Sequence, residues 1–418
     1  MRMLSRFLLC LFLLPNVLFA DPDAERSLEA AKIVNSFAAA HHRLMAQGNA
    51  LTSPWSIEMC MAMAYAGAEG KTSGAMRKAF FFPADDRLPV CFQSLRESLV
   101  AAPSADVVPG IRVANRIFHD QGLAPQPDWL TLTRTCYAAE AAPVDFRADP
   151  SGASRLINQW VSEQTAGKIP AIIPDGALNK LTRVVLVNAV YFDLPWEERF
   201  TKELTQDQPF HIDARQTRNV ALMFKQHQLG YVKKKGFQIA ALPYAGGKFQ
   251  FVVILPDAVD GLAKVEKAIT GELLSECARL NPTEVRLSFP RIRLEAPIVS
   301  LNRSLSALGA GLMFDSDHAD FSRMIHDPTE RVHISEVFHR TYLELDEEGT
   351  KAAAATAAGF SAATNGVPHE VPHKVVKADH PFLFMIQHIP TGTCLFLGRL
   401  VDPAIGTSAV VEPVAAKK

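Results

Sequence analysis

Residues 184–192 read Val-Val-Leu-Val-Asn-Ala-Val-Tyr-Phe, an almost unbroken apolar run that is rich in β-branched side chains. An apolar run without alternation is typical of a strand that is covered on both faces of its sheet. Similar apolar runs occupy residues 249–255, 381–389 and 394–400. Residues 285–289 alternate between apolar and polar side chains, as a strand with one solvent-exposed face does. The second part of the chain is therefore predicted to build large β-sheets.

The first part of the chain shows helical patterns instead. Apolar side chains recur at helical spacing from Ser27 to Gln47. A second helix is predicted from Ser53-Pro54 to Gly67, because serine caps a helix and proline suits its first position. A short helix that ends near Phe80 and an amphipathic helix over residues 152–164 follow. Since no repeat and no flexible linker divides the chain, we expect one α+β domain with a helix-rich N-terminal part and large mixed or antiparallel sheets.

Residues 1–20 have the anatomy of a secretory signal peptide. Two arginines give a positively charged start, residues 7–19 are nearly all apolar, and Ala20 is a small residue at a plausible cleavage site. The apolar run is too short to span a bilayer comfortably. We therefore expect export to the extracellular space, or to the periplasm of a Gram-negative bacterium, and a mature domain of residues 21–418.

The bulk composition excludes several kinds of partner and scaffold. The chain has 418 residues, 48% of them hydrophobic, and a formal net charge of -1. No basic block points to nucleic acid, and we expect neither a nucleic-acid nor a membrane partner. An odd number of widely spread cysteines follows the predicted cut, which favours buried thiols over a disulfide scaffold, although two pairs could form. These cysteines are Cys60, Cys91, Cys136, Cys277 and Cys394.

Residues 347–374 differ in composition from the globular remainder of the chain. The segment begins Glu-Glu-Gly-Thr-Lys, continues with four alanines and Thr356, and later contains Asn365-Gly366 and two prolines. It offers no large apolar side chain before Phe360 that could anchor it to a core. Loops of this length inside compact domains are usually functional or disordered. We therefore expect the function of the protein to reside in this segment.

Several segments resemble the serpin family, and they occur in serpin order from about residue 27 to residue 403. They are Asn49-Ala-Leu-Thr-Ser-Pro-Trp-Ser-Ile57, Asn188-Ala-Val-Tyr-Phe192 followed by Trp196, Ala319-Asp-Phe-Ser322, His380-Pro-Phe-Leu-Phe384 and Phe396-Leu-Gly-Arg-Leu-Val-Asp-Pro403. The resemblance implies the serpin fold with an exposed reactive loop at about residues 347–374. It also implies an inhibitor of serine-type endopeptidases that needs no cofactor and is not an enzyme.

The segment that begins at Glu347 closely resembles the hinge of inhibitory serpins. The resemblance implies that a protease cleaves the loop and that the hinge then inserts as a strand into the central sheet. Alternate side chains of such a strand face opposite sides, and small side chains pass between existing strands without clashes. Gly349 supplies backbone freedom where the loop turns in, and Thr350 is the first side chain to enter the sheet. The hinge residues are Glu347, Glu348, Gly349, Thr350, Ala352, Ala353, Ala354, Ala355 and Thr356.

Thr350 is expected to enter the sheet only after cleavage, and an arginine in its place is expected at the edge of the sheet or in solvent in the uncleaved protein. Insertion of about a dozen residues adds a similar number of backbone hydrogen bonds, each worth ~1 kcal/mol net. The total, on the order of ten kcal/mol, rivals the whole stability of a typical domain. The uncleaved protein is therefore expected to be metastable, and cleavage is expected to release enough free energy to distort an attached protease.

The position of the cleaved bond follows from the same resemblance. In inhibitory serpins the residue before the cut is usually the seventeenth from the hinge glutamate, which places the reactive bond at Ala363-Thr364. An alanine suits the shallow pocket of elastase-like or subtilisin-like proteases. Phe360-Ser361 is the alternative bond and predicts a chymotrypsin-like target. The expected partner is a serine protease in a covalent acyl-enzyme complex, with cysteine proteases as a second class, and the inhibitor is expected to be a monomer.

A further set of residues matches serpin positions at the opening of the sheet. We interpret the histidine among them as a structural hydrogen-bonding residue, because the sequence supplies no nucleophile for it to activate. These sheet-opening residues are Ser53, Ser56, Asn188 and His339.

Three other polar clusters are interpreted without a function. Residues 369–373 spell the zinc-protease pattern His-Glu-Val-Pro-His, but Pro372 prevents the helix that would place both histidines on one face, so no metal site is predicted. Lys233-Lys234-Lys235 is interpreted as a solvated hairpin rather than a polyanion site, and His41-His42 as helix surface. One alternative function stays open, a non-inhibitory serpin with a carrier, chaperone or storage role, although such a protein would usually show a damaged hinge.

Overall fold

The computed structural model describes residues 21–45, 48–99, 110–295, 298–325, 327, 331–350 and 373–404. The fold is α+β, as predicted. The α-helices in these ranges are α1 (Pro22–His42), α2 (Pro54–Ala66), α3 (Gly70–Ala79), α4 (Leu88–Leu99), α5 (Pro127–Tyr137), α6 (Pro150–Gln164), α7 (Leu262–Ala268), α8 (Gly271–Glu276) and α9 (Asn302–Leu305). Short turns of other helix types are η1 (Lys202–Leu204), η2 (Cys277–Arg279), η3 (Ser306–Ala310) and η4 (Gly311–Phe314).

One β-sheet contains the strand that the apolar run 184–192 predicts. Its neighbouring strands are, in order, β3 (Ala141–Val144), β2 (Ile111–Asp120), β4 (Val184–Phe192), β13 (Glu336–Leu345), β14 (Gly349–Thr350) and β5 (Leu194–Pro195), while β11 (Ile292–Glu295) and β12 (Val299–Ser300) also pair with β13. Every residue of β4 is buried, which confirms the prediction of a strand covered on both faces. We call this sheet the central sheet.

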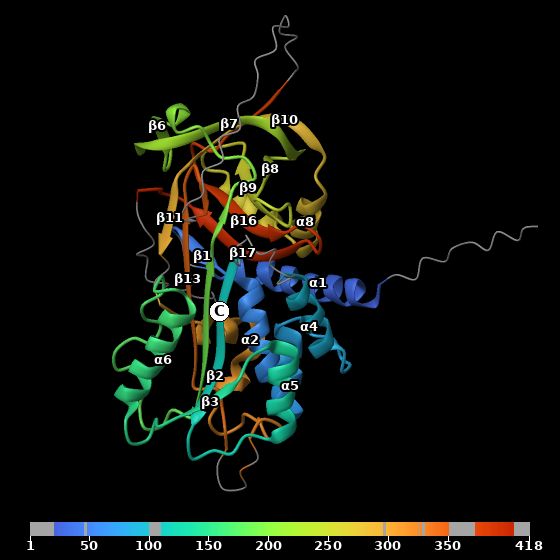
Figure 1. Cartoon of the computed structure of the whole chain (residues 1–418), viewed down its shortest axis with the longest axis vertical. Helices are drawn as coiled ribbons and strands as arrows, with labels where there is room; N and C mark the ends of the chain where they lie inside the picture. Colours follow the sequence, from blue (N-terminus) through green and yellow to red (C-terminus); the bar gives the residue numbers. More distant parts are fainter. Residues whose placement is uncertain are drawn as a thin grey trace, which may run out of the picture.

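The two faces of the central sheet pack against different helices. Leu186 and Val190 of β4 belong to the large core that includes α2, whereas Val187 and Tyr191 pack with residues of α6. Figure 1 shows this layering, with α6 on one side of β2 and β13 and with α2, α4 and α5 on the other side. We call the α2 side the core face and the α6 side the front face.

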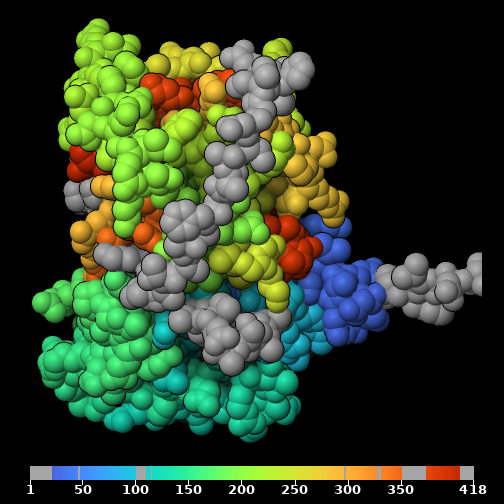
Figure 2. All heavy atoms as spheres, turned by 45° about the horizontal axis from the view of Figure 1, so that its top comes forward, coloured from blue at the N-terminus to red at the C-terminus, as the bar shows by residue number. Residues whose placement is uncertain are grey.

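A second sheet holds the other apolar runs of the sequence. Its strands are, in order, β1 (Ala50–Thr52), β17 (Thr393–Leu400), β16 (Phe382–His388), β9 (Phe249–Pro256), β8 (Phe237–Pro243), β7 (Thr217–Lys234), β10 (Pro282–Pro290) and β15 (Lys374–Lys377), and β6 (Gln206–His211) pairs with β7. In Figure 2 the yellow to red atoms of this sheet lie in the upper part, and the teal and blue-green atoms around α5 and α6 lie in the lower part.

Helix α2 runs beneath the central sheet and is buried from Pro54 to Ala64. The Ser53 side chain accepts a hydrogen bond from the N–H of Ser56, and Pro54 occupies the first turn. The helix ends at Gly67, as the sequence predicts. A helix with apolar side chains on every face lies inside a protein. Helix α2 fits this pattern apart from the buried Ser56 and Glu58, and it packs against β2 and β4.

The structure corrects two expectations about α1. The helix begins at Pro22 rather than at Ser27 and ends at His42 rather than near Gln47. His41 and His42 are buried, at 1% and 3% exposure, so their assignment to the helix surface is wrong. The physical reason is that α1 is enclosed by α2, α4, α8 and β17, and the His41 ring stacks on Phe37 with 5.1 Å between centroids.

The cysteines behave as the sequence predicts. Each of the five that follow residue 21 is buried and free. Across the described ranges, the structure contains no helix that is both long and apolar enough to cross a membrane.

Candidate functional site

Glu347 is held by a cluster of donors just beyond the end of β13. Only 3% of its side chain is exposed, and Arg291 Nε lies 3.0 Å from both carboxylate oxygens. Arg291 Nη2 and Thr205 Oγ1 each donate to Glu347 Oε1 over 2.6 Å. Burial raises the pKa of this carboxyl, but the donors outweigh burial and hold the pKa below its usual value. Glu347 is therefore an ionised anchor at the base of the predicted loop.

Glu348 is tied to the segment that follows β5. Its carbonyl oxygen accepts a hydrogen bond of 3.0 Å from the backbone N–H of Trp196. Its carboxylate pairs with Arg199 and with Lys202, each over 2.9 Å. Because 35% of this side chain is exposed, solvent weakens these ion pairs relative to the Glu347 cluster.

Gly349 packs directly against the backbone of β5. Its φ of +145° lies in the region that favours glycine. A Cβ at this position would lie 2.4 Å from Leu194 O and 2.5 Å from Pro195 Cα. Only glycine therefore allows the chain to pass this closely between β13 and β5.

Thr350 already lies inside the central sheet, and the expectation that it enters the sheet only after cleavage is wrong. It pairs with Leu345 of β13 and with Leu194 of β5, and it is fully buried. Its hydroxyl lies 2.8 Å from Tyr244 Oη. The reason is the close packing of Gly349 on β5, which carries the next residue between the strands.

Beyond Thr350 the strands that flank it pair with each other. The parallel pairing of β4 and β13 runs from Glu336 opposite Val185 to Tyr342 opposite Tyr191. The central sheet is therefore closed over these residues. The other predicted hinge residues and both candidate bonds lie outside the described residues, namely Ala352, Ala353, Ala354, Ala355, Thr356, Ala363-Thr364 and Phe360-Ser361.

The zinc-like pattern at residues 369–373 also lies outside the described residues, except for His373. Within the described part of the chain, no group of three or more His, Cys, Asp or Glu side chains could hold a metal ion. Lys233 and Lys234 lie at the β7–β8 hairpin, as predicted, and pair with Asp257 and Glu276. These ion pairs fit the interpretation of a solvated hairpin.

The structure brings the predicted sheet-opening residues together in one buried network. Asn188 of β4 donates from Nδ2 to Ser56 Oγ over 2.6 Å and to Asn115 Oδ1 over 2.9 Å. Asn188 Oδ1 and His339 Nδ1 are also hydrogen-bonded. The backbone N–H of Ser53 donates to His339 Nε2 over 3.2 Å. The network thus joins α2 to three adjacent strands, β2, β4 and β13.

The partners of His339 fix the protonation state of its ring. Nε2 accepts a hydrogen bond from Ser53, so Nδ1 carries the proton and donates it to Asn188. Burial, with a smaller contribution from His41, lowers the pKa of His339 to about 3. The ring is therefore neutral at physiological pH and acts as a structural link across the β4–β13 seam.

Sequence reasoning missed several residues that complete the site. Asn115 lies on β2, a strand that the sequence analysis did not predict, and pairs with Asn188 in the register of the sheet. Tyr244 and Arg291, which contact Thr350 and Glu347, lie far from the hinge in the sequence. No local sequence pattern identifies such contacts, because they form where the ends of β8 and β10 pack against the hinge.

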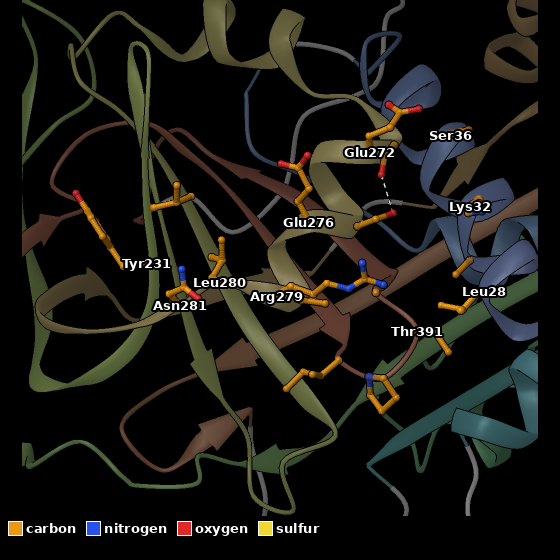
Figure 3. Close-up of a pocket in the computed structure, with 18 residues that line it drawn as sticks. Leu28, Lys32, Ser36, Tyr231, Glu272, Glu276, Arg279, Leu280, Asn281 and Thr391 are labelled. Atoms are coloured by element: carbon orange, nitrogen blue, oxygen red, sulfur yellow. Dashed lines mark hydrogen bonds between the residues drawn. The ribbon is translucent and has the colours of Figure 1, made fainter. Parts of the chain in front are cut away.

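A separate cavity of about 600 Å³ lies between α1 and α8. Its lining is mixed, with Leu28 and Lys32 on α1, Tyr231 on β7, and Arg279 after α8. Figure 3 shows the Arg279 side chain extended in the middle of this lining. Neither the hinge nor the buried polar network contributes to the lining, so the cavity is a second, independent feature.

Comparison with known proteins agrees with the fold. A family model described as "Serpin (serine protease inhibitor)" matches residues 30–403. The bovine (Bos taurus) "Leukocyte elastase inhibitor" is 39% identical over 367 residues, which cover 85% of this chain and 93% of the relative. Serpin48 of the insect Tenebrio molitor has 27% identity and a TM-score of 0.77, with 90% of this chain and 98% of that chain covered.

A further structural neighbour is human thyroxine-binding globulin in complex with its ligand. Its TM-score is 0.78 at 26% identity, and the match covers 90% of this chain and 99% of that chain. The family model covers most of the sequence, and the relatives and structures agree with it. This chain is a serpin, a member of the family of serine protease inhibitors.

Proposed function

We propose that the protein is an exported suicide-substrate inhibitor of serine proteases, whose cleaved loop inserts between β4 and β13. The position of Thr350 carries this proposal. A small, fully buried residue already occupies the space between β13 and β5, and the seam between β4 and β13 continues directly from it. The strand that the loop would add therefore has its first residue in place.

The chemistry follows from the expected bond at Ala363-Thr364. The serine oxygen of the protease attacks the carbonyl carbon of Ala363, the amide bond breaks, and the amine of Thr364 leaves with the proton that the protease supplies. The N-terminal part of the loop is then attached to the protease by an ester. If the loop inserts before water hydrolyses this ester, insertion distorts the protease, and the protease remains covalently attached.

Insertion exchanges one set of backbone hydrogen bonds for two. The direct pairing of β4 with β13 breaks, and the new strand pairs with both neighbours. The net gain is on the order of ten ladder bonds at ~1 kcal/mol each, which is comparable with the stability of a whole domain. The buried link between Asn188 and His339 crosses this seam, so it must rearrange during insertion.

The target class rests on two observations. Alanine at position 363 fits a shallow primary pocket, and several relatives, the bovine protein included, are leukocyte elastase inhibitors by name. We therefore propose an elastase-like or subtilisin-like serine protease as the target. Export is proposed from residues 1–20 alone.

A gel-based assay tests this function. Mature protein is incubated with a serine elastase, with subtilisin and with trypsin, and each mixture is denatured before electrophoresis. We expect a covalent complex with elastase or subtilisin and none with trypsin. Cleavage of the loop by all three proteases without any complex would contradict an inhibitory function.

A carrier role is the second candidate, and the cavity between α1 and α8 favours it. A volume of about 600 Å³ falls in the range of small-molecule sites, and the lining offers two cations, Lys32 and Arg279, to an anionic group, beside the carboxylates of Glu272 and Glu276. Because thyroxine-binding globulin shares the fold, thyroxine is a reasonable first probe. An increase in the melting temperature with thyroxine, lost in Arg279→Ala, supports this role, and an unchanged temperature in both proteins argues against it.

A further inference from the structure

The segment that follows α6 lies against the front face of the central sheet. Its three buried isoleucines, Ile169, Ile172 and Ile173, belong to the same apolar cluster as residues of β4 and β13. We call residues 165–173 the crossing segment. A strand that enters between β4 and β13 must therefore make room beneath this segment or beside it.

The crossing segment is held from two sides. Asn158 of α6 accepts with Oδ1 from the backbone N–H groups of Ile172 and Ile173, each over 2.8 Å. Arg340 of β13 donates from Nη1 to the carbonyl oxygen of Ala171 over 2.5 Å. A side chain that the crossing segment directs toward the sheet consequently starts from a fixed backbone position.

Lys168 of the crossing segment lies over the seam itself. Its Nζ is 5.9 Å from the ring centroid of Tyr191 on β4 and 5.6 Å from that of Tyr342 on β13. The two tyrosines are directly opposite in the register, with 6.1 Å between their ring centroids. An ammonium within about 6 Å of an aromatic centroid is attracted to the ring. One cation therefore bridges the two strands that insertion separates.

Carboxylates on the front face strengthen this bridge. Tyr191 Oη donates to Asp193 Oδ2 over 3.0 Å, and Tyr342 Oη donates to Glu344 Oε2 over 2.7 Å. A phenol that donates to a carboxylate is polarised, and its ring becomes more attractive to a cation. Burial raises the pKa of the Asp193 carboxyl, and the nearby Lys168 ammonium opposes that rise.

Insertion of a strand would break the bridge. A new strand between β4 and β13 moves them apart by a further ~4.8 Å, the spacing of neighbouring strands. The rings of Tyr191 and Tyr342 separate with their strands, and the new strand fills the space between them. The Lys168 ammonium can then keep one of the two rings at its present distance, but not both. The contact is thus available before insertion and is lost as the seam opens.

We propose that Lys168 restrains the opening of the β4–β13 seam, by binding Tyr191 and Tyr342 with one ammonium, and so limits the rate at which a strand inserts. This inference rests on the proposed insertion mechanism and adds a residue that controls its rate. The restraint keeps the seam closed in the uncleaved protein.

Entry of a loop peptide tests the proposal without a target protease. An acetylated peptide with the sequence of residues 351–362 carries a fluorescent label at its C-terminus and is incubated with intact protein. Fluorescence anisotropy gives the rate of entry, and a raised melting temperature of the complex identifies insertion. We expect the peptide to enter Lys168→Met about two- to fivefold faster than wild type, because one cation–ring contact no longer has to break.

Control variants show whether the cation and its position matter. Lys168→Arg keeps the positive charge and should take up the peptide at nearly the wild-type rate. Lys180→Met removes an exposed lysine that lies further along the same connection and should also behave as wild type. Lys168→Gln is a second way to remove the charge and should match Lys168→Met, so it replaces that variant if urea unfolding shows that Lys168→Met does not fold.

A double-variant comparison tests the bridge itself. Tyr342→Leu removes one of the two rings and should also speed entry. Because no bridge is then left to break, adding Lys168→Met to Tyr342→Leu should change the rate by less than twofold. An undiminished acceleration in the Tyr342→Leu background would show that Lys168 does not act through the facing rings, and the inference would be wrong.

The remaining outcomes separate this inference from the proposed function. If the peptide enters wild type, Lys168→Met and Lys168→Gln at one rate, the inference is wrong and insertion stands. The same holds if Lys168→Arg is as fast as Lys168→Met, or if the peptide enters neither wild type nor Lys168→Met although nicking stabilises wild type, since another barrier then limits insertion. If nicking fails to stabilise wild type, the proposed function itself fails.

Discussion

The hydroxyl groups of Tyr244 and Thr350 lie 2.8 Å apart in the interior of the protein, where both residues are fully buried. This contact joins the end of β8 to the first inserted residue of the hinge. The predicted hinge is therefore attached to the protein interior at Thr350. The Thr350 side chain is already bound within the central sheet, and in the proposed mechanism cleavage of the loop extends the strand from this residue.

Thr350→Arg is expected to convert the inhibitor into a substrate. An arginine at this fully buried position has no waiting partner, and its desolvation costs several kcal/mol, so the hinge must leave the sheet. A rise of ~3 kcal/mol in the insertion barrier slows insertion on the order of a hundredfold, and hydrolysis of the ester then wins. The stoichiometry of inhibition measures this.

Thr350→Ser is the matched control, because it keeps the small size and the hydroxyl that meets Tyr244. It should inhibit nearly as well as wild type. One-to-one covalent complexes with the arginine variant would show that this position does not have to enter the sheet.

Glu347→Gln should destabilise the intact protein, whereas Glu348→Gln should not. Glu347 is 3% exposed and accepts charged hydrogen bonds from Arg291, so its loss is expected to cost about 1.5–3 kcal/mol. Glu348 forms exposed ion pairs that are worth ~1 kcal/mol or less. Urea unfolding of both intact variants makes the comparison, and equal midpoints would contradict the anchoring role of Glu347.

The sequence predicts strand β4 of this site but not its partner strand β13. β4 is an apolar run buried on both faces, and its predicted bounds of 184–192 match the structure. The partner strand β13 mixes Glu336, Arg340 and Glu344 on its front with buried residues on its core face, and it was not predicted. A strand whose polar residues are satisfied by tertiary contacts, such as Arg340 with Glu295, lacks the apolar signal that identified β4.

The sequence could predict which residues form the candidate site, but not how these residues are arranged relative to one another. The hinge motif and Ser53, Ser56, Asn188 and His339 follow from the resemblance to serpins, and the structure places these four residues in one network. The burial of Thr350 could not be predicted, because it depends on the approach of Gly349 to β5. That approach is a property of chain packing and not of local sequence.

Acid is expected to destabilise the intact protein through its buried histidines. The pKa values of His339 and His41 lie at about 3 and about 4, below the value near 6.5 of an unfolded histidine, so the unfolded state binds protons first as the pH falls. Stability is therefore complete above about pH 6.5, and each of these residues removes about 2 kcal/mol by pH 5. Melting temperatures between pH 8 and pH 4 follow this loss.

His339→Gln should make this pH dependence shallower, because it removes one of the buried titrating groups. His318→Gln is the control, since 72% of the His318 side chain is exposed. If His339→Gln and wild type lose stability in parallel between pH 6.5 and pH 4, the neutral state of His339 is not required for folding.

Ala363→Arg should move inhibition from elastase-like to trypsin-like proteases, because arginine fills the acidic primary pocket of trypsin and not a shallow one. The rate of inhibition of each protease measures the change. Mass spectrometry of the C-terminal peptide released from wild type should place the cut after Ala363. A cut after Phe360 would leave the inhibitory mechanism intact and move the reactive bond to Phe360-Ser361.

The thermal stability of intact and loop-nicked protein tests the insertion mechanism most directly. A protease that cuts the loop without being trapped prepares the nicked form, and calorimetry of both forms gives their melting temperatures. Because insertion adds on the order of ten kcal/mol of ladder hydrogen bonds, the nicked form should melt tens of degrees above the intact form. A melting temperature that is unchanged or lower after nicking would contradict insertion between β4 and β13, and with it the proposed mechanism of inhibition.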